Sequence, residues 1–188
     1  GSMSGVLSPL SAVDLGAQAI KKAMERAGID GSLVEEVVMG NVIQANTGQA
    51  PARQAALAAG VQNGATCTTI NKVCASGMKA IILGAQSIML GDKDIVVAGG
   101  MESMTNAPFM ITNARNGYRY GNSNLIDAIV RDALQDPYSG LMMGSSGDKC
   151  AAKFNFSRED QDAFAIESYR RANEAYSNNS FGPELFDV

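Results

Sequence analysis

Histidine and tryptophan are both absent from this sequence of 188 residues, and cysteine occurs only three times. Without histidine, the chain has no Cys-His or Ser-His catalytic pair of its own and no histidine metal site. The three cysteines stand at irregular spacing with no Cys-x-x-Cys pair, which argues against a zinc site and against a disulfide framework. Cysteine that is sparse and unpaired is typical of a reducing environment, so we expect an intracellular protein.

Charge and hydropathy exclude two further classes of function. The net charge of −4 offers no electrostatic attraction to nucleic acid, so no nucleic-acid partner is expected. No apolar run reaches the length that spans a bilayer, so no membrane partner is expected. Gly1 and Ser2 resemble a cloning remnant before Met3, and we expect no signal peptide.

The stretch 67–100 predicts a strand, a turn, a helix and a second strand. Residues 67–70 are a short β-prone run, and the apolar residues of 78–89 recur at steps of three and four, as on a helix. Gly91 stands where a left-handed residue would end that helix. The continuous apolar run 95–98 predicts a strand that is buried on both faces.

Cys74 falls at the junction of the predicted turn and helix. The first amides of a helix lack intrahelical acceptors, and the macrodipole adds roughly half a positive charge there, so a thiolate at this place is stabilised. The small residues Ala75, Ser76 and Gly77 follow, which lets a ligand approach the backbone. The position predicts a reactive nucleophile; the alternative is a small apolar side chain buried beneath the helix.

The rest of the chain alternates helix and strand at first and is mainly helical afterwards. Ser11 with Asp14, and Ser157 with Asp160, each have the spacing of a capping box at a helix start. The stretch 115–121 is basic, and it either binds phosphate or forms a solvated or subunit-contacting loop. The predicted helices span 12–27, 51–59, 124–134, 146–154 and 158–177, and a further strand spans 36–43.

Several short motifs occur in order along the chain: 39–42 (MGNV), 48–54 (GQAPARQ), 71–77 (NKVCASG), 97–104 (VAGGMESM), 143–144 (MG) and 157–162 (SREDQD). Together they resemble the signatures of the thiolase family, which comprises the acetyl-CoA acetyltransferases and the 3-ketoacyl-CoA thiolases. The likeness covers nearly the whole chain and corresponds to the N-terminal part of that family.

The resemblance implies an α/β fold, with a thiolase-like N-terminal half of layered helices and a mostly parallel sheet. Residues 3–100 would form the core segment and 101–188 an incomplete, mainly helical loop domain, while the C-terminal thiolase domain and the first and last strands of the sheet are absent. We expect the first strand of the family to lie mid-sheet, so the three strands here would leave a central gap of unpaired backbone groups. The sheet would then close in another way or borrow a strand from a second copy.

The same resemblance implies a CoA-dependent C-acyltransferase in which Cys74 attacks the acyl thioester and forms an acyl-cysteine intermediate. The reaction would be Claisen condensation of acetyl-CoA or thiolysis of a 3-ketoacyl-CoA. Coenzyme A and acetyl-CoA would be substrates, with no covalently bound cofactor and no metal. The base histidine and second cysteine of the family have no counterpart here, so we expect the chain alone to be inactive.

The resemblance also implies that Met142, Met143 and Tyr169 lie near the substrate. Tyr169 falls where the family has a tyrosine near CoA, and in some members near a potassium ion; the alternative is half-buried packing. Met142 stands where members specialised for acetoacetyl substrates often have histidine, so it resembles broader-chain thiolases. A homodimer or homotetramer, a role in fatty acid or lipid metabolism, and a cytoplasmic or mitochondrial location are further expectations.

Two other interpretations share the fold. A non-catalytic thiolase-like protein would bind acyl-CoA or lipid, but a pure binder does not need an exposed cysteine at a helix start, so the segment 71–77 argues against it. A β-ketoacyl synthase relative would share the cysteine, but the segments 48–54 and 101–104 are of the thiolase type.

Overall fold

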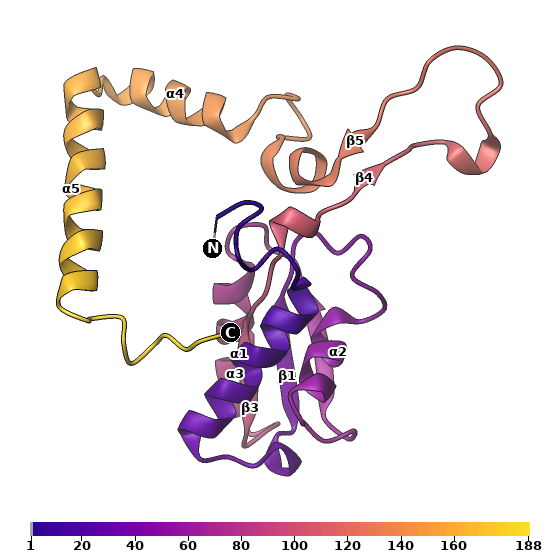
Figure 1. Ribbon diagram of the computed structural model, residues 1–188, viewed down its shortest axis with the longest axis vertical. Helices are drawn as coiled ribbons and strands as arrows, with labels where there is room; N and C mark the ends of the chain where they lie inside the picture. The colour runs from indigo at the N-terminus through magenta and orange to yellow at the C-terminus, as the bar shows by residue number, and fades with distance from the viewer. Residues whose placement is uncertain (1) are drawn as a thin grey trace. The chain divides into compact units, whose positions relative to one another are not determined.

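A three-stranded parallel sheet lies at the centre of the fold (Figure 1). The structure, a computed structural model, describes residues 2–188. Strand β1 (Glu36–Gly40) lies between β2 (Thr66–Ile70) and β3 (Val96–Gly100), so the strand order is β2-β1-β3. All three strands therefore end at the same edge of the sheet, which is where the loops that follow them meet.

The pairing of β1 shows that the sheet is continuous. Val37 of β1 pairs with Cys67 of β2 on one side and with Val97 of β3 on the other. The expected gap at the centre of the sheet is therefore wrong, because both rows of backbone groups on β1 already have partners. Within residues 2–188, the rows without a partner strand are the outer edges of β2 and β3.

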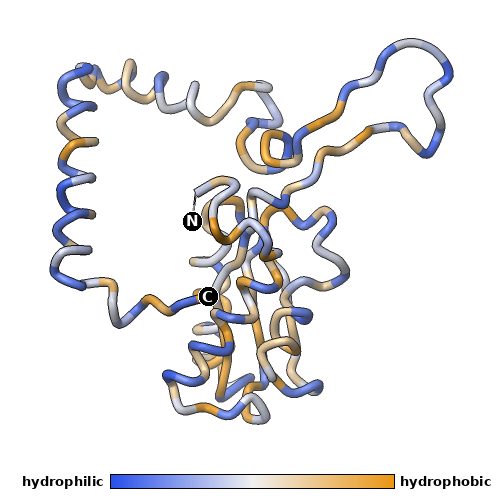
Figure 2. Tube along the Cα trace, viewed as in Figure 1, coloured by the Kyte–Doolittle hydropathy of each residue, from blue (hydrophilic) through white to orange (hydrophobic). Residues whose placement is uncertain are grey.

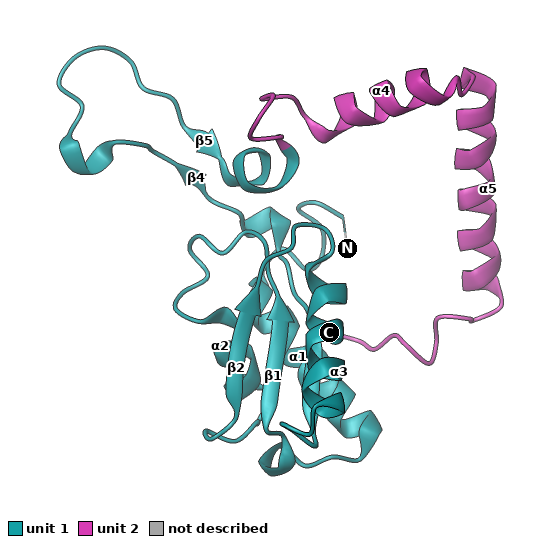
Figure 3. Cartoon of the chain, turned by 180° about the vertical axis from the view of Figure 1, so that it is seen from behind, with its two compact units in different colours: residues 1–134 teal, residues 135–188 magenta. Residues whose placement is uncertain are grey.

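The chain divides into two compact units, Gly1–Leu134 and Gln135–Val188, which Figure 3 shows in different colours. The sheet and the helices that cover it all belong to the first unit. The domain boundary between residues 100 and 101, expected from the sequence, stays a prediction.

Helices cover both faces of the sheet (Figures 1 and 3). Helices α1 (Ala12–Ala27) and α2 (Pro51–Ala58) pack against each other on one face, and α3 (Ser76–Met89) packs on the other. Successive side chains of a strand point to opposite faces, so Val37 and Met39 both join the core beneath α1 and α2. Other buried members of this core are Ile20, Met24, Val34, Ala52, Ala55, Ala56 and Val61.

Local signals fix both ends of α1, as the sequence predicted. The Ser11 hydroxyl accepts a hydrogen bond from the Asp14 amide at 3.1 Å, and the Asp14 carboxylate accepts one from the Ser11 amide at 2.9 Å. The side-chain and backbone hydrogen bonds of Ser11 also lower the pKa of the Asp14 carboxyl. Gly28 ends the helix with φ +65°, a conformation that costs glycine little.

Helix α3 turns its small residues toward the sheet and its large apolar residues outward. Ser76, Ala80 and Gly84 are buried, and a Cβ added to Gly84 would lie 3.0 Å from Val96 Cγ1. The predicted end of the helix is confirmed by Gly91, which has φ +75°. The large outward residues are Met78, Ile81, Ile82, Ile88 and Met89, and all of them are exposed. A helix that is apolar all round is normally enclosed, so its outer face is suited to further packing.

Strand β3 is half-buried, so the prediction of burial on both faces is wrong. Its outer edge is unpaired within residues 2–188, and a hollow of about 240 Å³ lies between its first three residues and the last turns of α1. The apolar run predicted the strand correctly, but the covering layers leave part of it open.

Residues after β3 form a long irregular excursion within the first unit. Strands β4 (Phe109–Met110) and β5 (Ile126–Asp127) pair antiparallel at its base, and the loop between them is largely polar (Figure 2). The helix predicted at 124–134 is wrong over residues 124–127, where β5 lies; residues 128–134 are helical, with a π-helix at Val130–Leu134. Short 3-10 turns lie at Gly31–Leu33, Met104–Asn106 and Ala114–Asn116.

The second unit consists of two helices with little burial. Helix α4 (Met143–Phe154) begins three residues before the predicted start, and α5 (Arg158–Ser177) matches its prediction. Ser157 and Asp160 form the predicted capping box of α5. Neither helix has a buried residue, so this unit has no core of its own among the residues described. No helix within residues 2–188 is both long and apolar enough to cross a membrane.

We expect Gly40→Ala to lower the free energy of unfolding by about 1–3 kcal/mol. The added Cβ would lie 2.5 Å from the Ser76 carbonyl carbon and 2.7 Å from the Gly77 amide nitrogen, so backbone must move. Urea denaturation followed by circular dichroism measures the change. Gly99→Ala is the matched control, because its Cβ would meet only Met39 Sδ at 3.7 Å. An equal loss in both variants would contradict the close approach of β1 to α3.

Candidate active site

Cys74 lies where the sequence predicted it, in the turn that joins β2 to α3. It precedes the first residue of α3, Ser76, by two positions, and its side chain is exposed. The turn stands beyond the carboxyl ends of the parallel strands, the edge at which open α/β sheets bind ligands. The alternative of a cysteine buried under the helix is therefore wrong.

The backbone immediately before Cys74 has a rare conformation. Val73 has φ +49°, in the left-handed region that β-branched residues seldom adopt. Its amide donates to Asn71 Oδ1 at 2.8 Å, and its carbonyl accepts from the Ser76 hydroxyl at 2.6 Å. The Ser76 hydroxyl also accepts from the Lys72 amide at 2.8 Å. The buried hydroxyl of Ser76 thus joins the first residue of α3 to the backbone before Cys74. We name residues 71–76 the nucleophile turn, after the role predicted for Cys74.

The start of α3 presents backbone donors beside Cys74. Its N-cap, Ala75, provides no side-chain cap, and the amides of Gly77 and Met78 have no acceptor within residues 2–188. Unpaired amides at a helix start attract a thiolate or a developing oxyanion. The turn therefore combines an exposed cysteine with backbone amides that have no acceptor within residues 2–188.

A carboxylate joins the ends of β1 and β3 at the same edge of the sheet. Glu102 accepts hydrogen bonds from the Val42 amide at 2.8 Å, the Ile43 amide at 3.2 Å and Asn41 Nδ2 at 2.7 Å. The Val42 carbonyl in turn accepts from Asn71 Nδ2 at 3.4 Å. Glu102 thus fixes the loop against which the nucleophile turn rests, a role that sequence reasoning missed.

Asn41, beside Glu102, is almost fully buried, and its Oδ1 has no hydrogen-bond partner among the described residues. Its Nδ2 faces two acceptors, the Glu102 carboxylate and the Met101 carbonyl, so the orientation of the amide is fixed by its partners. A buried acceptor without a donor is costly, so this oxygen is a place where a water or another donor would bind.

The three cysteines differ in environment. Cys67 is half-buried in β2, and burial raises the pKa of its thiol, an effect that the nearby Arg53 guanidinium opposes. Cys150 is exposed on α4, in the second unit. Of the three, Cys74 alone stands at the start of a helix with free amides, as judged over residues 2–188.

The remaining predicted site residues belong to the second unit. Met142 is the N-cap of α4, Met143 is its first residue, and Tyr169 lies in α5 with 75% of its surface exposed. The contact of these three residues with substrate stays a prediction, because they lie in the second unit and Cys74 lies in the first. Across residues 2–188, no group of three or more acidic, cysteine or histidine side chains is placed to hold a metal ion.

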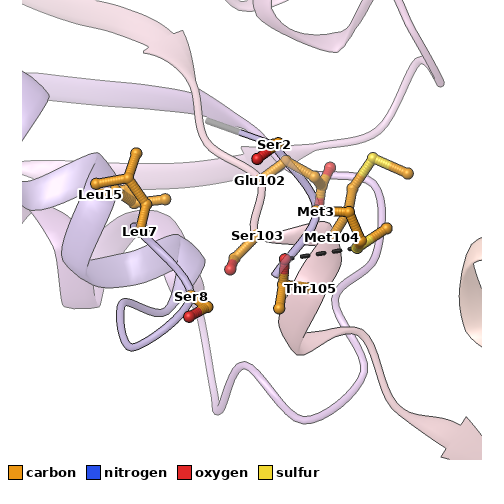
Figure 4. Close-up of a pocket in the computed structure, with 9 residues that line it drawn as sticks. All are labelled: Ser2, Met3, Leu7, Ser8, Leu15, Glu102, Ser103, Met104 and Thr105. Atoms are coloured by element: carbon orange, nitrogen blue, oxygen red, sulfur yellow. Dashed lines mark hydrogen bonds between the residues drawn. The ribbon is translucent and has the colours of Figure 1, made fainter. Parts of the chain in front are cut away.

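A cavity of about 290 Å³ lies between the N-terminal segment and the loop after β3 (Figure 4). Figure 4 shows Met3 beside Thr105, whose hydroxyl donates to Met3 Sδ at 3.5 Å. None of the predicted site residues lines this cavity. Glu102, which binds the backbone of the loop after β1, does line it, whereas none of residues 71–76 does.

Fold and site together define an α/β protein with an exposed free cysteine at the carboxyl edge of a parallel sheet. The family model "Thiolase, N-terminal domain" matches residues 1–188, so the chain belongs to the thiolase family. This confirms the resemblance seen in its motifs.

Similar proteins agree with this assignment. The acetyl-CoA acetyltransferase of Schizosaccharomyces pombe is 53% identical over 188 residues, and acetyl-CoA acetyltransferase 2 of Arabidopsis thaliana is 52% identical. Both matches cover all of this chain, which spans about half the length of these relatives, 48% and 47%. The crystal structure of Acat5 thiolase from Ascaris suum in complex with coenzyme A matches with a TM-score of 0.96 and 44% identity, covering 100% of this chain and 48% of that one. The expected thiolase fold is thereby confirmed.

Cys74 should react with iodoacetamide several-fold faster than Cys67 at neutral pH. Cys74 is exposed at free helix amides, whereas burial raises the pKa of the Cys67 thiol and limits access to it. Peptide mass spectrometry after timed quenching gives the rate at each cysteine. Exposed Cys150 is the control for access alone, and equal rates at Cys74 and Cys150 would contradict an activating role of the helix start.

Glu102→Gln should lower the free energy of unfolding by about 1.5–3 kcal/mol, because one carboxylate oxygen becomes an amino group that faces donors. Chemical denaturation of the purified chain measures the loss. Asp92→Asn makes the same chemical change at an exposed position and serves as the control. If both variants were equally stable, Glu102 would not be the link between the loops after β1 and β3.

Proposed function

We propose that the complete protein is a CoA-dependent C-acyltransferase and that Cys74 carries the acyl group. The observation that supports this most is the exposed sulfur of Cys74 beside the unpaired amides of Gly77 and Met78. Once its proton is removed, a sulfur in this position can attack a thioester, because thiolates are the nucleophilic form of cysteine.

In the first step of condensation the Cys74 thiolate attacks the thioester carbon of acetyl-CoA, a bond forms from Sγ to that carbon, the old carbon–sulfur bond breaks, and CoA leaves as a thiolate that takes up the proton removed from Cys74. In the first step of thiolysis the Cys74 thiolate attacks C3 of a 3-ketoacyl-CoA, the bond between C2 and C3 breaks, and acetyl-CoA leaves as its carbanion takes up the proton removed from Cys74. In the second step the acyl group passes to CoA in thiolysis, or to the carbanion of acetyl-CoA in Claisen condensation. Either transfer restores the Cys74 thiolate.

The proton of Cys74 must be removed by a group outside this sequence, since the chain contains no histidine. The exposed apolar face of α3, formed by Met78, Ile81, Ile82, Ile88 and Met89, supports packing of a further segment close to the turn. The second unit also lacks a core among its described residues, which supports the same view. The base would arrive with the segment that covers α3.

The names of the relatives support an acetyl substrate, since those cited above are acetyl-CoA acetyltransferases. The coenzyme A bound to the Ascaris suum thiolase supports CoA as the carrier. We further propose that Met142, Met143 and Tyr169 contact the substrate, with Tyr169 as the neighbour of any potassium ion. We also propose that the complete protein is a homodimer or homotetramer. It would act in fatty acid or lipid metabolism, in the cytoplasm or the mitochondrion.

Acetoacetyl-CoA tests this assignment on the chain itself. On incubation, the peptide that contains Cys74 should gain one acetyl group faster than the peptide that contains Cys150, because only Cys74 lies at free helix amides. Cys74→Ser should remove the labile acetyl group, and peptide mass spectrometry detects both results. Multiple turnover in thiolysis should be very slow without the missing base.

Two results would contradict the proposal. Equal acetylation of Cys74 and Cys150 would show that the turn does not favour acyl transfer. Rapid turnover of acetoacetyl-CoA by this chain alone would show that the base lies within the sequence after all.

A further inference from the structure

Val73 is the strained point of the nucleophile turn. Its φ of +49° brings the Cβ of an L-residue close to its own backbone, and the branched side chain of valine makes this conformation less favourable still. The side chain is 47% exposed, so packing of the valine does not enforce the conformation. A strained residue persists only where its surroundings hold it in place.

Two side chains hold the peptide groups on either side of Val73. Asn71 Oδ1 accepts from the Val73 amide at 2.8 Å, and the Ser76 hydroxyl donates to the Val73 carbonyl at 2.6 Å. These bonds fix the direction of the backbone that enters Cys74. Two backbone hydrogen bonds, from the Ser76 amide to the Val73 carbonyl and from the Ala75 amide to the Lys72 carbonyl, both 3.1 Å, hold the same turn from its other side.

Asn71 is itself held by the rest of the sheet edge. Its Nδ2 donates to the Val42 carbonyl at 3.4 Å, and the Val42 amide donates to Glu102 at 2.8 Å. The position of the turn is therefore linked to the ends of β1 and β3 through one exposed amide side chain.

We propose that Asn71 is a positioning residue that holds Val73 in its left-handed conformation and so keeps the sulfur of Cys74 at the start of α3. The inference rests on the proposed function only in taking Cys74 as the acyl acceptor. The position of the Cys74 sulfur at the start of α3 does not depend on that function. Ser76 acts with Asn71, but it is buried against the backbone of Gly40, so Asn71 is the side chain that can be changed without disturbing the packing.

The test compares rates of iodoacetamide labelling at Cys74 in the full 188-residue chain. Asn71→Ala removes the acceptor of the Val73 amide, and we expect about fivefold slower labelling of Cys74, the effect of one lost hydrogen bond. Asn71→Ser keeps an oxygen that can accept from the amide two residues on, so its rate should stay within about twofold of the unchanged chain. Cys150 is the internal reference in every sample.

A second pair of variants tests whether Asn71 acts by holding Val73 in its strained conformation. Glycine adopts positive φ without steric cost, so in a Val73→Gly background Asn71→Ala should change the rate at Cys74 by less than about twofold. If Asn71 only stabilised the fold, Asn71→Ala would slow the labelling of Cys74 by the same factor with valine as with glycine at position 73.

Three results would overturn the inference: an unchanged or faster rate in Asn71→Ala, an equal loss in Asn71→Ser, or an equal change at Cys74 and Cys150. The proposed function fails separately, in the acetoacetyl-CoA experiment. A chain whose Cys74 is not acetylated, but whose labelling rates follow the expected order, would disprove acyl transfer and retain the role of Asn71.

Discussion

The pairing of β1 with strands on both sides is the constraint on which the site depends. Because β2, β1 and β3 are parallel and in register, their carboxyl ends meet at one edge, at Ile70, Gly40 and Gly100. The loops that leave these ends are then close enough for one carboxylate, that of Glu102, to bind the backbone after β1. The Cys74 turn rests on this assembly through Asn71.

Close contact between α3 and the sheet has a second consequence. Small residues, Ala80 and Gly84 among them, occupy the inner face of α3, so its large apolar side chains are left on the outer face. Close approach places the helix start directly over the end of β1, where Gly40 leaves room for the backbone of Ser76 and Gly77. The same packing that positions the start of α3 after Cys74 therefore also leaves an apolar surface on the outer face of this helix.

Elements with strong local signals were predictable. The capping boxes of Ser11 with Asp14 and of Ser157 with Asp160 formed as expected, because all partners lie within one turn of helix. The helix expected at 124–134 failed over residues 124–127, since pairing of β5 with β4 connects residues that are far apart in sequence. Strand order failed for the same reason: no local pattern reveals that β1 has neighbours on both sides.

By itself, the sequence determined that a cysteine follows a β-prone run and precedes an apolar helix, and its motifs determined the family. Periodicity, caps and turns act over a few residues, so they can be read directly from the chain. Only the tertiary structure decided the left-handed conformation of Val73, the three donors around Glu102 and the outward direction of the large residues of α3. The donors of Glu102 lie about sixty positions before it, as Val42 does, so they meet it only when the strands have paired. The side chains that hold Val73 are local, but Asn71 is itself held by the Val42 carbonyl, which follows another strand.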